Sequence, residues 1–175
     1  GSERRDVGCH RRGVGAPFAV DAAWGEKLEP LAGTLTSARG TRPNPSTYLS
    51  TPYIAAHLGQ FRGGVTRFAA SPPSRPMLGP PGGTFVMPKS LADRLVSKAA
   101  GNVAKLERLL GLDAGTLGSS PVRLDLATPP SLRMPSGNEL GANGQWIPGG
   151  FTSGGMLEAV IDPVPMADVL ISPTF

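Results

Sequence analysis

Residues 84–110 read TFVMPKSLADRLVSKAAGNVAKLERLL, and this stretch decides the class of fold. Its first four residues are rich in β-branched and aromatic side chains and are closed by Pro88, which predicts a strand over 84–87. The remainder reads as two helices with no strand between them. A strand followed by two successive helices does not fit the regular alternation of a parallel α/β sheet.

The boundaries of the two helices follow from their polar residues. Ser90 and Asp93 have the spacing of a capping box, which predicts the start of the first helix. Leucine and alanine then recur every four residues and form one apolar stripe. Gly101 breaks this helix, and Asn102 is expected to cap a second helix that stops at Gly111.

Outward from this stretch, further elements point to the same class. A short strand is predicted over 65–68, a cleanly alternating strand over 122–126, and a final apolar segment over 157–161. Thr51, followed by proline, is expected to cap a helix that runs to about residue 60. Helices and strands are mixed without regular alternation, so the sequence predicts an α+β fold.

Composition describes a loop-rich globular chain. Its 175 residues include 24 glycines and 19 prolines, yet 39% of residues are hydrophobic and only 17% are charged, unlike a disordered polymer. Residues 1–45 show little periodicity and are interpreted as a leader or linker, disordered in part. Residues 46–175 are expected to form one domain, with long loops rich in glycine and proline.

The scarcity of reactive side chains excludes several chemistries. Cys9 is the one cysteine, so the chain has neither an internal disulfide nor a cysteine zinc site, and two histidines make a histidine-rich metal centre improbable. We therefore expect no metal. A net charge of +4 without a concentrated basic patch does not mark a nucleic-acid-binding protein. No run of 18 apolar residues is present, so we expect no membrane span.

A glycine-rich loop over 134–158 draws attention because it also carries bulky apolar residues. Trp146, Ile147 and Phe151 interrupt its glycines, as in a shaped surface that approaches a ligand rather than in a linker. The loop delivers Glu158 to the mouth of a strand. An unpaired carboxylate in an apolar segment is costly, which makes Glu158 a candidate functional residue.

This order of parts resembles the ADP-ribosyltransferase superfamily, especially the toxin domains at the C-termini of bacterial polymorphic (Rhs-type) secreted effectors. The resemblance covers roughly residues 46–165. It rests on Gly63-Gly64-Val65-Thr66-Arg67-Phe68, on Phe85-Val86-Met87-Pro88-Lys89-Ser90, and on the loop that ends Gly154-Gly155-Met156-Leu157-Glu158.

The resemblance implies a split β-sheet core, with NAD as the substrate between its halves. By this resemblance, Arg67 grips the NAD diphosphate and Ser90 helps to shape the nicotinamide pocket. Glu158 would bind the nicotinamide-ribose hydroxyl and support an oxocarbenium-like transition state. Physical chemistry is compatible with these roles, because one carboxylate beside the anomeric carbon stabilises the positive charge without a metal. Phe85 or Trp146 is suited to stacking on a nicotinamide or adenine ring.

The function implied is that of a toxin that cleaves NAD at the nicotinamide–ribose bond and passes ADP-ribose to a macromolecular acceptor, RNA or protein. Arginine is not the preferred acceptor, because Met156 stands where arginine-modifying members carry a second glutamate. The resemblance further implies a secreted effector that acts in the cytoplasm of a target cell. Its producer would need a cognate immunity protein.

Other readings remain open. With water as acceptor, the same site is an NAD glycohydrolase; a metal-independent ribonuclease would use His57, Lys89 and arginines. A pure binding module is a third alternative. The residues also have structural explanations: Arg67 as the solvent side of a strand, Glu158 in a structural ion pair, Ser90 as a helix cap and His57 as a core histidine.

Overall fold

The computed structural model describes residues 33–34, 36–144 and 146–175. Most of the predicted leader, residues 1–45, therefore lies outside the described residues. The elements within the described part follow in chain order: η1 Pro45–Thr47, α3 Thr51–Gly59, β1 Val65–Ala69, β2 Met77–Leu78, β3 Thr84–Pro88, α4 Lys89–Ala99, α5 Val103–Leu110, β4 Val122–Leu126, β5 Ala159–Ile161, β6 Val164–Pro165, η2 Met166–Asp168 and β7 Leu170–Pro173.

The central sheet has five strands in the order β5-β3-β1-β4-β7, and β2 and β6 form a second, two-stranded sheet. All the pairings are antiparallel. The mixed class of helices with an antiparallel sheet is thus confirmed. β1 pairs with β4 along all five of its residues, but with β3 at only two positions, Val65↔Pro88 and Thr66↔Met87.

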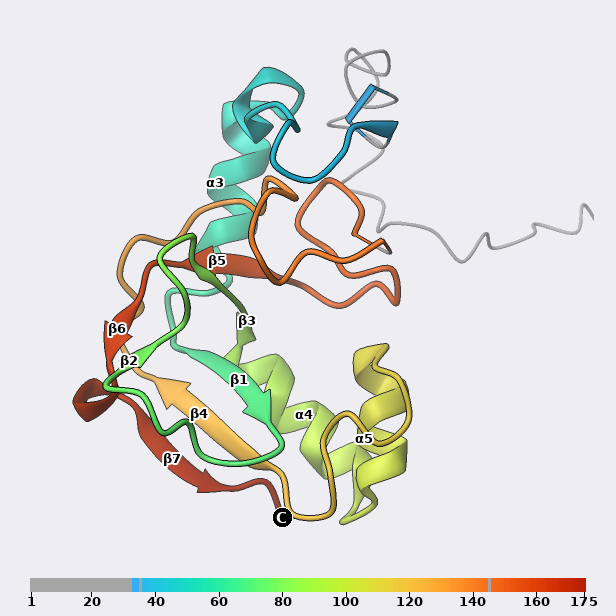
Figure 1. Cartoon of the computed structure of the whole chain (residues 1–175), viewed down its shortest axis with the longest axis vertical. Coiled ribbons are helices and arrows are strands. Elements are labelled where there is room, and N and C mark those ends of the chain that lie inside the picture. The colour runs from blue at the N-terminus through green and yellow to red at the C-terminus, as the bar shows by residue number, and fades with distance from the viewer. Residues whose placement is uncertain (1–32, 35, 145) are drawn as a thin grey trace, which may run out of the picture.

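A hydrophobic cluster lies on each of the two faces of the central sheet. Figure 1 shows the strands of this sheet together with α4 and α5. On one face, side chains from the strands pack against Phe61, β2 and β6. On the other face, α4 and α5 pack through Leu95, Leu106 and Leu110. Fully buried apolar side chains on both sides stabilise the fold chiefly by removing their surface from water.

The helix boundaries confirm one predicted cap and correct two. The Asn102 side chain accepts from the Lys105 N–H at the start of α5, and Gly111 ends the helix with φ +71°, both as predicted. The side chain that caps α3 belongs to Ser50, one residue before Thr51. The capping box predicted for Ser90 is wrong, because α4 begins at Lys89 and its N-cap residue is Pro88, with no side-chain cap.

The direct junction between β3 and α4 explains why no capping box forms. The Lys89 N–H donates to the Gly64 carbonyl at 3.0 Å, so the pairing of β3 with the chain before β1 continues into the first helical residue. Pro88 has no N–H to satisfy. Ser90 consequently lies inside the first turn, and Asp93 pairs with Lys89 instead of capping a backbone donor.

The short strands were not predicted from the sequence. β2 and β6 are two residues long, and three of the four residues of β7 are exposed, so β7 shows no alternation of buried and exposed side chains. β7 lies at one edge of the sheet. Its place there depends on pairing with β4, which residue pattern alone does not indicate.

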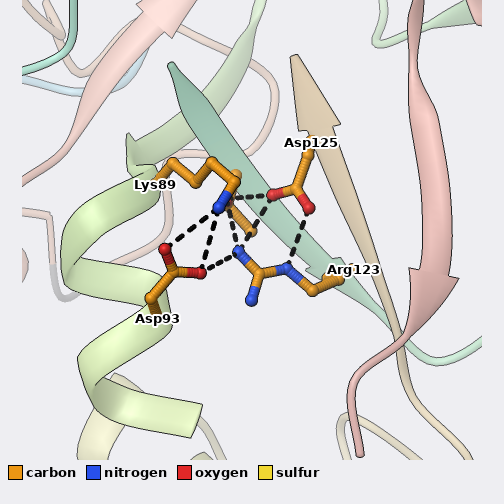
Figure 2. Close-up of polar contacts among 5 residues, drawn as sticks. Lys89, Asp93, Arg123 and Asp125 are labelled. Atoms are coloured by element: carbon orange, nitrogen blue, oxygen red, sulfur yellow. Dashed lines mark hydrogen bonds and ion pairs between the residues drawn. The ribbon is translucent and has the colours of Figure 1, made fainter. Parts of the chain in front are cut away.

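A polar cluster joins α4 to the sheet (Figure 2). Arg123 of β4 contacts Asp93 at 2.8 Å and Asp125 at 3.0 Å, and Lys89 contacts Asp93 at 3.0 Å. The buried Thr66 hydroxyl donates to Asp125 from the neighbouring strand. Arg123 and Asp125 are largely buried, and their mutual pairing offsets the cost of removing both charges from water.

Within the described residues, no helix has both the length and the apolar character needed to cross a membrane.

Candidate functional site

A pocket opens where the pairing of β1 with β3 ends. Its volume is about 460 Å³. β1 and β3 contribute to its walls, as do the C-terminal end of α5, loop residues 141–143 and 146, and the segment that leads into β5. Four of the five residues predicted for the site line this pocket: Arg67, Phe85, Trp146 and Glu158.

Arg67 spans the gap between the two strands. Its guanidinium donates to the Phe85 carbonyl at 3.1 Å, one residue beyond the last paired position of β1 with β3. The side chain is exposed to solvent within the pocket, while the surrounding protein lowers its pKa by desolvation. It forms no ion pair with any carboxylate that the structure describes, so its remaining donors are open to an anionic ligand.

The two aromatic residues differ in how much of each ring a ligand could reach. Phe85 is half-buried in β3, and its ring lies against the backbone of Gly141, where an added Cβ would be 3.1 Å away. Trp146 is 8% exposed, and the Arg42 guanidinium lies over its ring at 4.6 Å from the centroid. Phe85 is therefore better placed for stacking, and Trp146 forms a wall of the pocket.

Glu158 is carried by a tight hairpin just before β5. An isolated bridge joins Phe151 to Leu157, and the Thr152 N–H donates to the Met156 carbonyl at 2.8 Å. The Glu158 N–H donates to the Gly150 carbonyl at 2.8 Å, which closes the hairpin. The final turn of the glycine-rich loop thus fixes the backbone of the glutamate.

The Glu158 carboxylate has no partner among the residues that the structure describes. It makes no hydrogen bond and no ion pair with the residues that the structure describes. Burial in the pocket wall raises its pKa to about 8, and the negative charge of Glu139 adds to the shift. A carboxylate with so perturbed a pKa, in a pocket that is also lined by an arginine without an ion-pair partner among the described residues, is typical of a functional site.

Ser90 lies elsewhere. It is exposed in the first turn of α4 and is not among the residues that line the pocket. Ser90 therefore neither caps α4 nor lines the pocket with the other four predicted site residues.

Glu139 organises a turn within the glycine-rich loop. The buried Glu139 carboxylate accepts from the N–H and hydroxyl of Ser136, both at 3.0 Å, and from the Gly137 N–H at 2.9 Å. The buried carboxylate thus accepts hydrogen bonds from nearby backbone donors and so stabilises the turn. The geometry therefore assigns Glu139 to turn chemistry.

Residues 39–42, which the sequence analysis placed in the leader, are bound to this loop. The Gly40 and Arg42 N–H groups donate to the Asn138 side chain at 2.8 and 3.0 Å, and Asn138 returns a bond to the Arg42 carbonyl at 2.8 Å. Arg42 also donates to the Gly137 carbonyl at 2.6 Å. Sequence reasoning missed these contacts, since no local pattern links positions about a hundred residues apart.

The residues proposed for a ribonuclease occupy structural positions. His57 is 3% exposed, and its Nε2 lies 2.9 Å from the Glu158 backbone carbonyl. Lys89 pairs with Asp93. Neither residue lines the pocket that holds Arg67 and Glu158.

Chemically, the pocket offers a cationic group on β1, an aromatic ring on β3 and a carboxylate from the hairpin just before β5. No group of three or more histidine, cysteine, aspartate or glutamate residues suited to a metal ion occurs in the part of the chain that the structure describes. No protein-family model matches this chain, and a comparison with curated proteins gives no significant match.

Proposed function

We propose that this domain cleaves NAD at the nicotinamide–ribose bond and transfers ADP-ribose to a macromolecular acceptor, RNA or protein. The observation that carries the proposal is the presence of Arg67 and Glu158 in one pocket, each without an ion-pair partner among the described residues. If their role were structural, we would expect them to pair with each other or with a neighbour, because an ionisable group that is partly removed from water is costly unless it is paired.

The proposed chemistry needs few groups. Arg67 contacts the diphosphate, because a guanidinium makes paired hydrogen bonds with phosphate oxygens. The Phe85 ring supports a flat heterocycle. The ionised Glu158 stabilises the positive charge that develops on the ribose as nicotinamide departs. The acceptor's oxygen or nitrogen then bonds to the anomeric carbon as the bond to nicotinamide breaks, and its proton passes to water.

The architecture around the pocket also supports the proposal. The resemblance found in the sequence implies a split sheet with the nucleotide between its halves, and the pocket lies where β1 and β3 stop pairing. The remaining parts of the proposal rest on the resemblance alone: a secreted effector that acts in the cytoplasm of a target cell, and an immunity protein in the producer.

A direct test measures free nicotinamide after the purified protein is incubated with NAD, with and without cell lysate or RNA. Glu158→Gln is expected to lower the rate about 100-fold or more, as is usual when a group that stabilises transition-state charge is removed. Arg67→Gln is expected to act mainly through a higher KM for NAD. Asp168→Asn and Arg75→Gln make matched changes at exposed residues outside the pocket and should leave the rate unchanged.

The outcomes separate the alternatives. Release that needs lysate or RNA supports the transferase, and radiolabelled ADP-ribose then marks the acceptor. Rapid Glu158-dependent release with NAD alone indicates a glycohydrolase that depletes NAD. If no nicotinamide is released under either condition, the NAD proposal is wrong. A ribonuclease dependent on His57 and Lys89 is less well supported, because both residues lie outside the pocket.

A further inference from the structure

Helix α3 is attached to the segment that carries Glu158 through two side chains one helical turn apart. The Tyr53 hydroxyl donates to the Gly149 carbonyl at 2.6 Å, and His57 Nε2 contacts the Glu158 carbonyl at 2.9 Å. Residues four apart lie on the same face of a helix, so both side chains reach the base of the same hairpin.

The surroundings of His57 determine which form of the ring is present. A carbonyl oxygen only accepts, so Nε2 must carry the proton that it donates to Glu158. Tyr53, Phe61 and Phe151 surround the imidazole, the latter two with ring centroids 5.3 Å from it. Burial among these rings lowers the pKa of His57, which favours the neutral ring.

Gly150 lies against the His57 ring and also binds the backbone of Glu158. Its φ is +82°, and a Cβ added there would lie 2.3 Å from His57 Nε2. Its carbonyl accepts the Glu158 N–H at 2.8 Å. Both backbone polar groups of Glu158 are thus bound at one place, where the loop closes directly over the imidazole ring.

We propose that His57 is a positioning residue for Glu158, whose backbone it holds through Nε2–H so that the carboxylate keeps its place in the pocket wall. This inference rests on the proposed function for its catalytic meaning. The contact itself is independent of NAD. His57 does not line the pocket, so it is not placed to act as an acid or base for the substrate, and it reaches the site through its contact with the Glu158 backbone carbonyl.

The test compares two substitutions of His57 with a control. His57→Phe keeps a buried ring but removes the donor, whereas the amide of His57→Gln can still donate from a similar reach. Tyr48→Phe is the control, because Tyr48 is a fully buried tyrosine whose hydroxyl has no hydrogen-bond partner in the described structure. Rates are corrected for the folded fraction, and the pKa of Glu158 is followed by carboxyl NMR.

We expect His57→Phe to lower kcat roughly 10- to 100-fold with little change in KM, because a small displacement of a reacting group is costly. We expect the pKa of Glu158 to fall from about 8 toward its ordinary value, as the loosened carboxylate gains solvent. His57→Gln should restore most of the rate, and Tyr48→Phe should match the wild type. A purely structural histidine would alter stability but neither kcat per folded molecule nor the pKa of Glu158.

Other outcomes also test the proposed role of His57. If His57→Phe folds and keeps both kcat and the pKa of Glu158, the positioning role is wrong. If the wild type releases no nicotinamide, the proposed function fails and the pKa comparison alone decides whether His57 holds Glu158. If His57→Phe does not fold, the wild-type Nε2 resonance decides: coupling through the hydrogen bond to the Glu158 carbonyl supports the contact, and an unprotonated Nε2 overturns it.

Discussion

At the scale of single residues, the proposed reaction depends on Glu158, whose environment opposes the ionised form that this reaction would need. Burial and the nearby charge of Glu139 raise its pKa to about 8, so at pH 7 roughly one molecule in ten carries the ionised carboxylate. The nicotinamide ring of bound NAD is cationic. A positive charge nearby favours the carboxylate, so binding of the substrate would promote ionisation.

This reasoning predicts the pH dependence of nicotinamide release. In the proposed reaction the ionised carboxylate is the active form, so kcat/KM should rise about tenfold per pH unit below pH 8 and level off above it. The apparent pKa in the pH profile of kcat should be lower than that in the profile of kcat/KM, because kcat reports the protein with NAD bound. Rates measured from pH 5 to 10 test both expectations. A kcat/KM that is constant between pH 6 and 9 would contradict the assignment of Glu158.

The same pKa shift predicts an effect on stability. Between pH 4.5 and 8 the folded protein holds the Glu158 proton more tightly than the unfolded chain, so its stability falls as pH rises through this window. Glu158→Gln removes the ionisation. Relative to wild type, this variant should gain roughly 1–4 kcal/mol at pH 9 and little at pH 4. Urea unfolding at the two pH values measures the difference, with Asp168→Asn as the control.

At the scale of elements, helix caps show where a local signal needs its neighbours to be interpreted. The motif at Ser90 and the motif at Asn102 look equally convincing in the sequence. Only Asn102 caps a helix, because the first backbone donor of α4 is already bonded to Gly64 across the β1–β3 junction. Because α4 follows β3 directly, its first N–H already has an acceptor, and no side-chain cap is needed there.

A matched pair of alanine substitutions tests this difference. Asn102→Ala leaves the Lys105 N–H without its acceptor and should destabilise the protein by about 1 kcal/mol. Ser90→Ala should change the free energy of unfolding by less than about 0.5 kcal/mol, as for an ordinary surface position. Chemical denaturation gives both values. Equal losses for the two variants would mean that Ser90 does cap α4.

At the scale of the whole molecule, the pocket is assembled from parts that are distant along the chain. β1 and β3 supply Arg67 and Phe85, while the hairpin before β5 supplies Glu158. Residues 39–42 secure the loop that carries Trp146. A fragment beginning at residue 46, the boundary expected from the sequence, would lack these contacts.

Arg42 provides the test at this scale. Arg42→Ala removes the cation over the Trp146 ring and the bond to the Gly137 carbonyl, and should cost about 2 kcal/mol. The corresponding fall in Tm is roughly 5 °C. Arg42→Lys should recover only part of this, because an ammonium group lacks the planar fork. Arg62→Ala, at an exposed arginine, is the control, and a loss of similar size there would contradict the role of Arg42.

Local patterns in the sequence were sufficient for the mixed class, the strand at 122–126, the second helix of the quoted stretch and its stop at Gly111. These features depend on backbone groups and side chains within a few residues of one another, and such short-range preferences are encoded position by position. Four candidate site residues were also recognisable, because an arginine on a short strand and a glutamate after a glycine-rich loop stand out by their residue types.

How these parts meet depends on contacts between distant positions of the folded chain. The bond between Thr66 and Asp125 joins positions 59 residues apart, and the contact of His57 with Glu158 joins positions 101 residues apart. Contacts of this kind depend on strand order and on which loop closes over which helix. The period of a strand or helix indicates which face is buried, but it carries no information about the partner that covers that face. The unpaired carboxylate, its raised pKa and the histidine that holds its backbone therefore follow from the folded chain alone.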